Sequence, residues 1–358
     1  MVSRETDRVR LGRPDVGADE LAAVAEVLET GMLTMGPRVA EFEEELARAC
    51  GTRHAVAVAN GTAALHVAVL ALGLQPGDEV IVPAYTFPAT GNVLLLSGLK
   101  PVIVDVDPET MNLDPAQLKI GPRTKAILGV HLFGRPMRVE ELPDGVPFLE
   151  DAAGALGARR RGRPCGSLGV EACFSFHPRK IVTTGEGGAV TTDSDRLAEL
   201  ARRLRNHGWR DLASADMPAA GLNYRLSDLL CAIGTPQLRR LDELLAARTR
   251  IAAGYAERLR DLPVTLPAAD EGDVHGWQAY VIQVDRRDDI LAALRGQGIE
   301  AQIGTFALHL LAPYRDQGFC PGAERAFERS LALPFHTQLT ESELDRVAEA
   351  LDKLVSHH

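Results

Sequence analysis

One lysine of this chain stands where covalent chemistry is expected. Lys180 follows the strand-like run Phe174-Ser175-Phe176 and precedes the glycine cluster Gly185-Glu186-Gly187-Gly188. Burial disfavours an ammonium ion and can lower the pKa of a lysine by several units from about 10.4. The neutral amine forms Schiff bases with carbonyl compounds. A single lysine is more often a solvated surface residue, so a covalent role requires the rest of a binding site for an aldehyde such as pyridoxal phosphate.

Two further segments suit the phosphate of such a cofactor. In Asn60-Gly61-Thr62-Ala63 a predicted strand ends and a helix begins, so unpaired N–H groups and the positive end of the helix dipole converge. Ser175 lies five residues before Lys180, which allows its hydroxyl to face the same cavity. Taken alone, Gly-Thr before a helix is more often a simple cap.

An aspartate and an aromatic ring complete the constellation. Asp151 ends the predicted strand Pro147–Asp151, and in an open parallel sheet ligands bind at the carboxyl ends of the strands. A carboxylate there can keep a pyridinium nitrogen protonated, which lets the ring draw electrons from a substrate carbon. A helix N-cap is the alternative for Asp151. Phe87 offers a flat ring for stacking on a planar cofactor, with a core aromatic as the alternative.

The elements that must position these residues are short apolar strands alternating with helical stretches over residues 53–190. Such strands, separated by helices, indicate a mostly parallel sheet that is covered on both faces. We therefore predict an α/β architecture. The expected strands are Ala55–Ala59, Glu79–Pro83, Pro101–Asp105, Ala126–Val130 and Pro147–Asp151, and the expected helices are Thr62–Leu72 and Ala89–Leu96.

The pattern changes after Asp193. Helices are predicted over Asp195–Arg205 and Ser227–Arg260, the second long enough to bridge two domains, and Pro263–Asp273 resembles a linker. A strand at Trp277–Val284 and helices at Asp288–Arg295 and Glu341–Val355 follow. The predicted organisation is therefore a large α/β domain over residues 1–240 and a smaller α+β domain over residues 241–358, which begins in the bridging helix.

The composition argues against several classes of function. A formal net charge of −10 argues against a nucleic-acid partner, and no apolar run approaches the roughly 20 residues that span a membrane. Residues 1–13 lack the apolar core of a signal peptide, so we expect a cytoplasmic protein. His357-His358 resembles the start of a purification tag. The scattered cysteines predict buried free thiols and no metal; they are Cys50, Cys165, Cys173, Cys231 and Cys320.

Ordered motifs extend over nearly the whole chain. They are Gly31–Pro37, Phe42-Glu43, Asn60–Ala63, Pro76–Val80, Pro83–Phe87, Val130–Gly134, Glu150–Ala153, Phe174–Gly188, Asn206–Gly208, Asn223–Arg225 and Gln237-Leu238. Together they resemble the DegT/DnrJ/EryC1/StrS family of sugar aminotransferases, which have the aspartate-aminotransferase fold (fold type I). So many motifs in the same order make a chance resemblance very unlikely.

The resemblance implies a role for each residue of the constellation. Lys180 would form the internal aldimine with pyridoxal 5'-phosphate (PLP) and then act as general acid and base. Asp151 would hold the pyridine nitrogen, and Phe87 would lie against the ring. The phosphate would be bound by Gly61, Thr62, Ala63 and Ser175, and by Asn223 of the neighbouring subunit, so the family pattern also implies a homodimer.

Two segments depart from the family pattern. After Asp-Ala-Ala the family often has glutamine or histidine, which reaches the 3-hydroxyl of the cofactor, whereas this chain has Gly154. The ring would lose that hydrogen bond, or a water or another side chain would take the role. The segment Gln302–Thr305 also differs from many members. A related branch that performs dehydration carries histidine in place of the lysine; this chain keeps Lys180, and His177 and Glu186 are interpreted as packing and turn residues.

The expected function is the transfer of an amino group from an amino acid, by resemblance L-glutamate, to a nucleotide-diphospho keto-sugar, first of all a 4-keto-6-deoxyhexose. One alternative is the same chemistry on a 3-keto sugar or a cyclitol ketone. Another is a PLP-binding regulatory protein without turnover. The presence of Asp151, Ser175, Lys180 and Asn223 together argues against the regulatory alternative.

Overall fold

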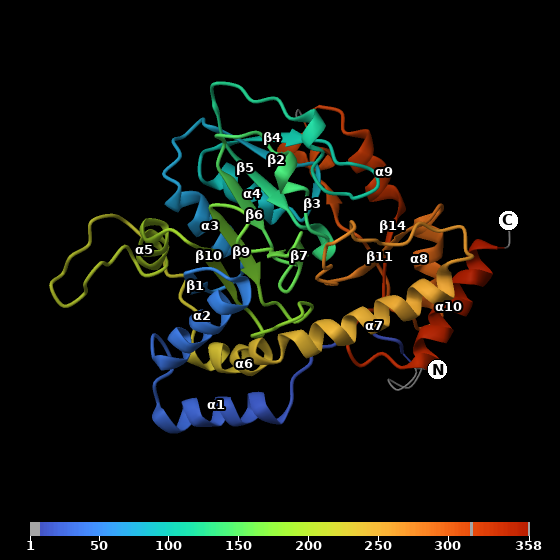
Figure 1. Cartoon of the computed structure of the whole chain (residues 1–358), viewed down its shortest axis with the longest axis horizontal. Coiled ribbons are helices and arrows are strands. Elements are labelled where there is room, and N and C mark those ends of the chain that lie inside the picture. Colours follow the sequence, from blue (N-terminus) through green and yellow to red (C-terminus); the bar gives the residue numbers. More distant parts are fainter. Residues whose placement is uncertain (1–7, 316–317, 357–358) are drawn as a thin grey trace.

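A seven-stranded sheet forms the centre of the computed structural model, which describes residues 8–315 and 318–356 (Figure 1). The strand order is β1-β10-β9-β6-β5-β2-β4, and all neighbours are parallel except the two pairs made by β10. The strands are β1 (His54–Val58), β2 (Glu79–Pro83), β4 (Lys100–Val104), β5 (Thr124–Val130), β6 (Phe148–Asp151), β9 (Glu171–Ser175) and β10 (Gly188–Thr192). The predicted α/β architecture is confirmed. Residues 1–7 of the charged N-terminal segment and His357-His358 lie outside the described residues.

Helices cover both faces of this sheet because its strands are apolar on both sides. Alternate residues of β1 belong to two different cores, with Val56 and Val58 in one and Ala55 and Ala57 in the other. The first core is completed by α3 (Gly61–Ala71), α4 (Ala89–Leu96) and α5 (Asp195–Leu204), and the second by α2 (Pro37–Cys50) and α6 (Asp228–Arg239). Helix α1 (Ala18–Thr30) packs outside α6 (Figure 1).

The C-terminal part has a third core of its own. It gathers residues of α7 (Leu241–Leu259), α8 (Arg287–Gly296), α10 (Glu341–Val355), β11 (Tyr280–Gln283) and β14 (Ser330–Leu333). Helix α9 (Pro321–Arg329) instead packs on the first core, and Asp105 at the end of β4 accepts the N–H groups of Gly322 and Ala323 at its start (both 2.8 Å). The division into domains 1–240 and 241–358 stays a prediction.

Short elements complete the described chain. The small strands are β3 (Tyr85–Thr86), β7 (Arg159–Arg160), β8 (Arg163–Pro164), β12 (Gln302–Ile303) and β13 (Phe306–Ala307). Short 3-10 helices lie at Pro115–Gln117, Leu132–Gly134, Val139–Glu141, Leu308–Leu310 and Ala312–Tyr314. The five cysteines are free and buried, as predicted. No helix among the described residues is both long and apolar enough to cross a membrane.

The single helix predicted over Ser227–Arg260 is wrong in one respect, because the chain forms α6 and α7 with a break at Arg240. Arg240 leaves helical geometry, with φ −106° and ψ 23°. One turn earlier, Pro236 lacks the N–H that would continue the helical hydrogen bonds of α6. The guanidinium of Arg240 donates to Asp15 (2.7 Å), which fixes the break against the N-terminal segment.

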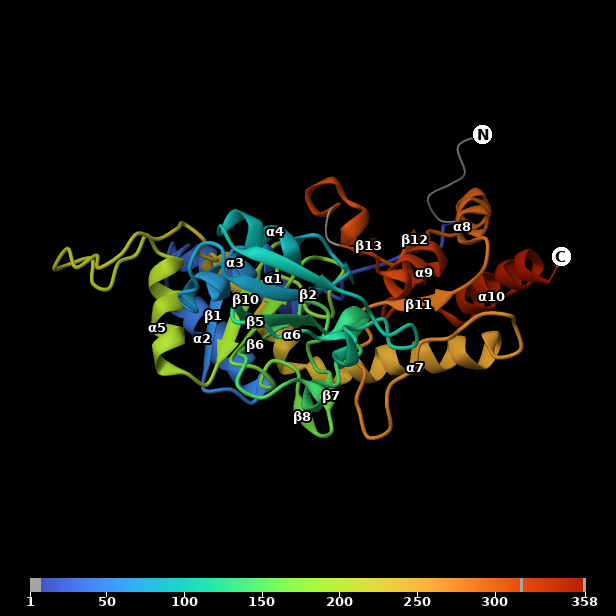
Figure 2. The same ribbon diagram turned by 90° about the horizontal axis from the view of Figure 1, so that it is seen from above.

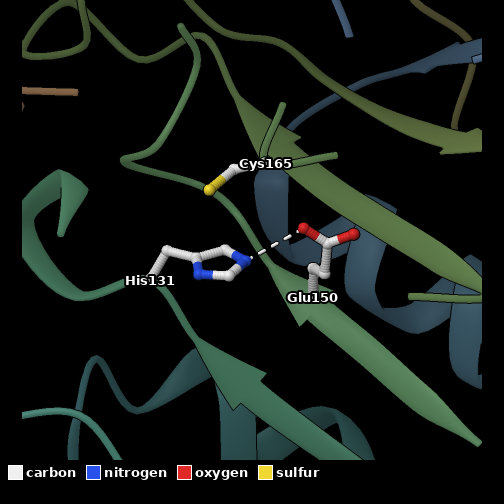
Figure 3. A group of neighbouring side chains, drawn as sticks. All are labelled: His131, Glu150 and Cys165. Atoms are coloured by element: carbon white, nitrogen blue, oxygen red, sulfur yellow. Dashed lines mark hydrogen bonds and ion pairs between the residues drawn. The ribbon is translucent and has the colours of Figure 1, made fainter. Parts of the chain in front are cut away.

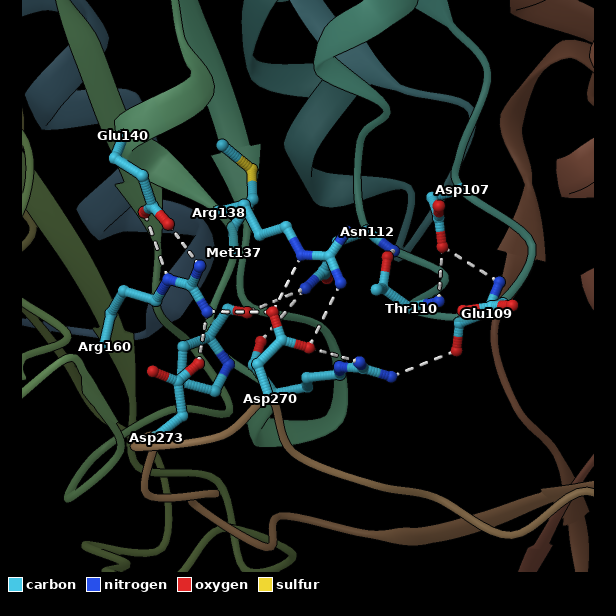
Figure 4. Close-up of polar contacts among 12 residues, drawn as sticks. Asp107, Glu109, Thr110, Asn112, Met137, Arg138, Glu140, Arg160, Asp270 and Asp273 are labelled. Carbon is cyan, nitrogen blue, oxygen red and sulfur yellow. Dashed lines mark hydrogen bonds and ion pairs between the residues drawn. The ribbon is translucent and has the colours of Figure 1, made fainter.

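The segment predicted to be a linker, Pro263–Asp273, is fixed by ion pairs (Figure 4). The carboxylate of Asp270 accepts hydrogen bonds from Arg138 (2.8 Å), Arg135 (2.7 Å) and Arg160 (2.9 Å). The hydrogen bond from Arg138 is the main reason that the pKa of Asp270 lies well below its usual range. The segment connects α7 to β11 and is also attached to the large sheet through the loop after β5.

Candidate active site

Lys180 lies in a tight turn after β9. Its N–H donates to the carbonyl of His177 (2.8 Å), and Nδ1 of His177 accepts the N–H of Arg179 (3.3 Å). The side-chain amide of Gln237 in α6 accepts the N–H of Thr183 (3.0 Å) and donates to its carbonyl (2.8 Å). The turn that carries Lys180 is therefore stabilised by hydrogen bonds among its own residues and by the side chain of Gln237 in α6.

The surroundings of Lys180 favour a neutral amine. The residue is half-buried, and burial lowers its pKa to about 8. The negative charge of Asp151 opposes this shift, whereas the guanidinium groups of Arg179 and Arg248 add to it. An amine with such a pKa is uncharged in a useful fraction of molecules near neutral pH, which a nucleophile requires.

Asp151 is the last residue of β6 and lies buried at the carboxyl edge of the sheet. Its carboxylate accepts a hydrogen bond from the hydroxyl of Thr90 (2.8 Å) and another from the N–H of Ala153 (3.2 Å). Burial raises the pKa of Asp151, and the two hydrogen bonds and the charge of Lys180 oppose the rise. A cationic ring nitrogen beside this carboxylate would be stabilised by its negative charge.

The start of α3 lies against the end of β9. A Cβ atom on Gly61 would lie 2.8 Å from Cβ of Ser175, so glycine is required for this close approach. Asn60 caps the helix by accepting the N–H of Ala63 (2.8 Å). Among the described residues the N–H groups of Gly61 and Thr62 have no hydrogen-bond partner. These two amides and the hydroxyl of Ser175 lie together where an anion was expected, whereas the amide of Ala63 is already used in the cap.

Phe87 follows β3 and is 59% exposed, which is unusual for a large aromatic residue. Its ring makes an edge-on contact with Phe306, with the centroids 6.2 Å apart. Strand β3 is held in place by antiparallel pairing with β13. An exposed ring on a fixed backbone suits stacking on a planar ligand.

Asn223 lies at the base of an arm, residues 206–222, that projects from the body of the chain (Figure 2). An antiparallel bridge between Asn206 and Asn223 closes the base of the arm. The side chain of Asn223 is exposed, and no hydrogen bond among the described residues joins it to Gly61 or Ser175. This position leaves Asn223 accessible to a second subunit.

Among the described residues one group has the spacing of metal ligands, namely His131, Glu150 and Cys165 (Figure 3). Nδ1 of His131 accepts the N–H of Met137 (2.9 Å), which leaves Nε2 as the protonated nitrogen that donates to Glu150 (2.9 Å). The carboxylate of Glu150 also accepts the N–H groups of Gly166, Leu168 and Gly169 (each 2.7 Å). These contacts occupy the acceptor positions of His131 and Glu150, so the group works as a structural network.

Several residues that support the site could not be selected from the sequence. Thr90 lies three residues after Phe87 and reaches Asp151 only because α4 packs at the end of β6. Gln237 belongs to a quoted motif, but its contact with Thr183 is a product of the fold. The only available signal was membership of a motif for Gln237 and closeness to a motif for Thr90, and neither predicts a contact.

The residues present fit PLP. The chain offers an amine with a lowered pKa, a buried carboxylate, an exposed ring, and a helix start whose free amides face a hydroxyl at a distance that only glycine permits. The fold and this set of groups are those of a PLP-dependent enzyme of the α/β class.

Comparison with known proteins identifies the family. The sequence profile of the DegT/DnrJ/EryC1/StrS aminotransferase family matches residues 14–352. GDP-perosamine synthase of Caulobacter vibrioides is 40% identical over 365 residues, which cover 97% of this chain and 98% of that protein. The chain belongs to the DegT/DnrJ/EryC1/StrS aminotransferase family, and it is a PLP-dependent sugar aminotransferase.

Solved structures agree in fold. DesI, crystallised in the presence of its TDP-sugar product, has a TM-score of 0.92 and 37% identity, with 98% of this chain and 94% of that chain covered. The PLP form of the sugar aminotransferase Spr1654 from Streptococcus pneumoniae has a TM-score of 0.92 and 28% identity, with 98% of this chain and 99% of that chain covered. The resemblance that the sequence motifs indicated is therefore confirmed, together with the fold class.

Proposed function

We propose that this enzyme transfers an amino group from L-glutamate to a nucleotide-diphospho keto-sugar, and that the acceptor is a 4-keto-6-deoxyhexose. The observation that carries the proposal is the environment of Lys180. Burial lowers the pKa of this lysine to about 8, and its amine interacts electrostatically with the buried carboxylate of Asp151. The Caulobacter relative is named as the synthase of a GDP-linked sugar, and DesI was crystallised in the presence of its TDP-sugar product. Both relatives support a nucleotide-sugar acceptor.

Each residue then has a defined task. Lys180 would hold the cofactor and would move a proton at the substrate carbon. Asp151, oriented by Thr90 and Ala153, would keep the ring nitrogen of the cofactor protonated. When bound, the cofactor supplies an electron sink for the bond that is broken at that carbon. Phe87 would cover one face of the ring, and the exposed position of that side chain supports this task.

The phosphate is assigned to the start of α3. Gly61 and Thr62 would donate their free amides and Ser175 its hydroxyl. Ala63 would contribute through the helix dipole, since its own amide is engaged by Asn60. We further propose a homodimer in which Asn223 of one subunit completes the phosphate site of the other, as the projecting arm would allow (Figure 2).

The first experiment is an absorption spectrum of the purified protein before and after addition of L-glutamate. A band near the border of the visible and ultraviolet that moves to shorter wavelength would support cofactor binding and the first half-reaction. The aminated protein is then offered a 4-keto-6-deoxy, a 3-keto and a cyclitol ketone, and products are identified by mass spectrometry. Exclusive turnover of the 3-keto sugar or the cyclitol would refute the acceptor. A band that no amino acid converts would instead favour the regulatory alternative.

A further inference from the structure

Gly154 has a neighbour that its position in the sequence does not suggest. A Cβ atom built on Gly154 would lie 3.2 Å from Cγ, 3.3 Å from Cβ and 3.3 Å from Oε1 of Gln278. The side chain of Gln278 therefore occupies the space into which a side chain at position 154 would extend. Gly154 is not in the left-handed region, so its backbone alone does not demand glycine. A side chain at position 154 would therefore be in tight contact with Gln278.

The main chain of Gln278 is fixed at this place. Its N–H donates to the carbonyl of Phe133 (3.1 Å), and its carbonyl accepts from the buried guanidinium of Arg248 (3.1 Å). Arg248 also donates to the carbonyl of Trp277 (2.8 Å), which adopts a positive φ of 45°. A non-glycine residue with positive φ costs energy and persists where its surroundings hold it. Gln278 is thus presented toward Gly154 by a rigid backbone.

The side-chain amide of Gln278 is free to bind a ligand. The residue is half-buried, and its amide has no hydrogen-bond partner among the described residues. Gly154 is separated from Asp151 only by Ala152 and Ala153, and the N–H of Ala153 contacts the Asp151 carboxylate (3.2 Å). The free amide therefore lies beside the segment that holds the proposed cofactor site.

We propose that Gln278 replaces the missing side chain of position 154 and donates a hydrogen bond to the phenolic oxygen of bound PLP. This inference rests on the proposed function, because it assumes the cofactor between Asp151 and Lys180. Gln278 comes from a different region of the chain than Asp151, but its amide occupies the same space that a glutamine at position 154 would use. Its role is that of a positioning residue which also adjusts the acidity of the cofactor.

The test uses the absorption band of the bound cofactor as a function of pH. A hydrogen bond to an ionised oxygen favours the ionised form. Without that hydrogen bond the phenolic oxygen of the cofactor is more basic. The proton that it shares with the nitrogen of Lys180 is then lost only at higher pH. For Gln278→Ala we expect the midpoint of the spectral titration to rise by about one to two pH units, the range for a hydrogen bond to a charged group. The isosteric Gln278→Glu removes the donor without changing the shape of the side chain, and we expect a rise in the same direction.

A second substitution makes the test specific. Gln278→Ala opens the space beside Gly154, so the double variant Gln278→Ala/Gly154→Gln should return the midpoint toward the wild-type value. Gln338→Ala, at an exposed position whose side chain donates to the carbonyl of Pro14, is the matched control and should leave the midpoint unchanged. Unchanged midpoints in Gln278→Ala and Gln278→Glu, with an intact band and melting temperature, would overturn the inference alone. A wild-type protein that shows no band with added PLP would overturn the proposed function and this inference together.

Discussion

The hydroxyl of Thr90 donates a hydrogen bond to Oδ2 of Asp151 across 2.8 Å, and both residues are buried. The contact joins the second residue of α4 to the last residue of β6. Because Asp151 is desolvated, this hydrogen bond helps to keep its carboxylate ionised and fixes its orientation. A residue outside every quoted motif therefore sets the direction of the carboxylate.

Thr90→Val keeps the shape of the side chain and removes its donor. We expect kcat/KM to fall about ten- to a hundredfold, the range for one hydrogen bond to a charged group, while cofactor is retained. Thr86→Val is the matched control, because the Thr86 hydroxyl contacts Thr90 (3.1 Å) and has no hydrogen bond with Asp151. Equal losses in both variants would contradict a specific role for Thr90.

Lys180→Ala should give a folded protein without the absorption band of the linked cofactor and without turnover. The substitution removes the amine and leaves the turn intact, since the turn is held by the backbone bond to His177 and by Gln237. Circular dichroism and thermal unfolding check the fold. Lys125→Ala, at an exposed position, serves as control. Normal turnover by Lys180→Ala would contradict the assignment of Lys180 as the lysine that binds the cofactor.

The rate of covalent PLP uptake by the cofactor-free protein should rise with pH and be half-maximal near pH 8, where Lys180 loses its proton. In Asp151→Asn the midpoint should move to lower pH, because the charge of Asp151 raises the pKa of Lys180. The activity of this variant should fall by orders of magnitude.

In the unfolded chain, Lys180 keeps its proton up to about pH 10.4. The free energy of unfolding of the cofactor-free protein should therefore rise with pH between about 8 and 10.4. Stopped-flow absorbance and urea unfolding measure the two effects, and a rate midpoint near pH 10 would contradict the assignment.

The dimer proposal can be tested by mixing subunits. Lys180→Ala and Asn223→Ala homodimers should each be impaired. If Asn223 serves the partner's site, a mixed dimer has one site with an intact lysine and an intact asparagine. Random assortment of equal amounts should then restore about a quarter of wild-type activity. Activity equal to the average of the two parents would show that Asn223 acts within its own subunit or not at all.

Glu150→Gln should lower the free energy of unfolding by about 2–4 kcal/mol, because a buried carboxylate that accepts three backbone N–H groups and the His131 ring is replaced by an amide with fewer acceptors. Glu171→Gln is the control: both carboxylate oxygens of Glu171 are buried and have no hydrogen-bond partner in the described part of the chain, and burial raises the pKa of Glu171 to about 8. The Glu171→Gln change should alter the free energy of unfolding only slightly.

Added EDTA should leave the stability of the wild type and of both variants unchanged. Destabilisation of the wild type by EDTA would identify the group of His131, Glu150 and Cys165 as a metal site.

The fold was largely predictable because apolar runs bounded by glycine and proline leave few alternatives. The bounds of β2, α4 and α10 agree residue for residue with the prediction. Strand β10 was not predicted: Gly188-Ala-Val-Thr-Thr192 is short and follows a turn, and its antiparallel direction depends on its partners β1 and β9. Chain direction in a sheet is a tertiary property.

The candidate site was predictable in its chemistry and less so in its contacts. Lys180 and Asp151 stand out because a lysine and an aspartate that follow or end a predicted strand each suggest a specific task. Thr90 and Gln278 do not stand out, since a threonine or glutamine becomes important only through the residue that it meets in space. The contact of Gln278 with Gly154 joins positions that no local pattern relates.

The pairing of β3 with β13 bears on how the protein is made. Tyr85 and Thr86, which directly precede Phe87, pair with the strand Phe306–Ala307, and the ring of Phe87 is contacted by Phe306. During synthesis from the N-terminus, the lysine, the aspartate and the helix start all leave the ribosome well before that strand does. The growing chain can therefore fix Phe87, the proposed aromatic wall of the cofactor site, only late in translation, and the complete proposed site belongs to the nearly finished polypeptide.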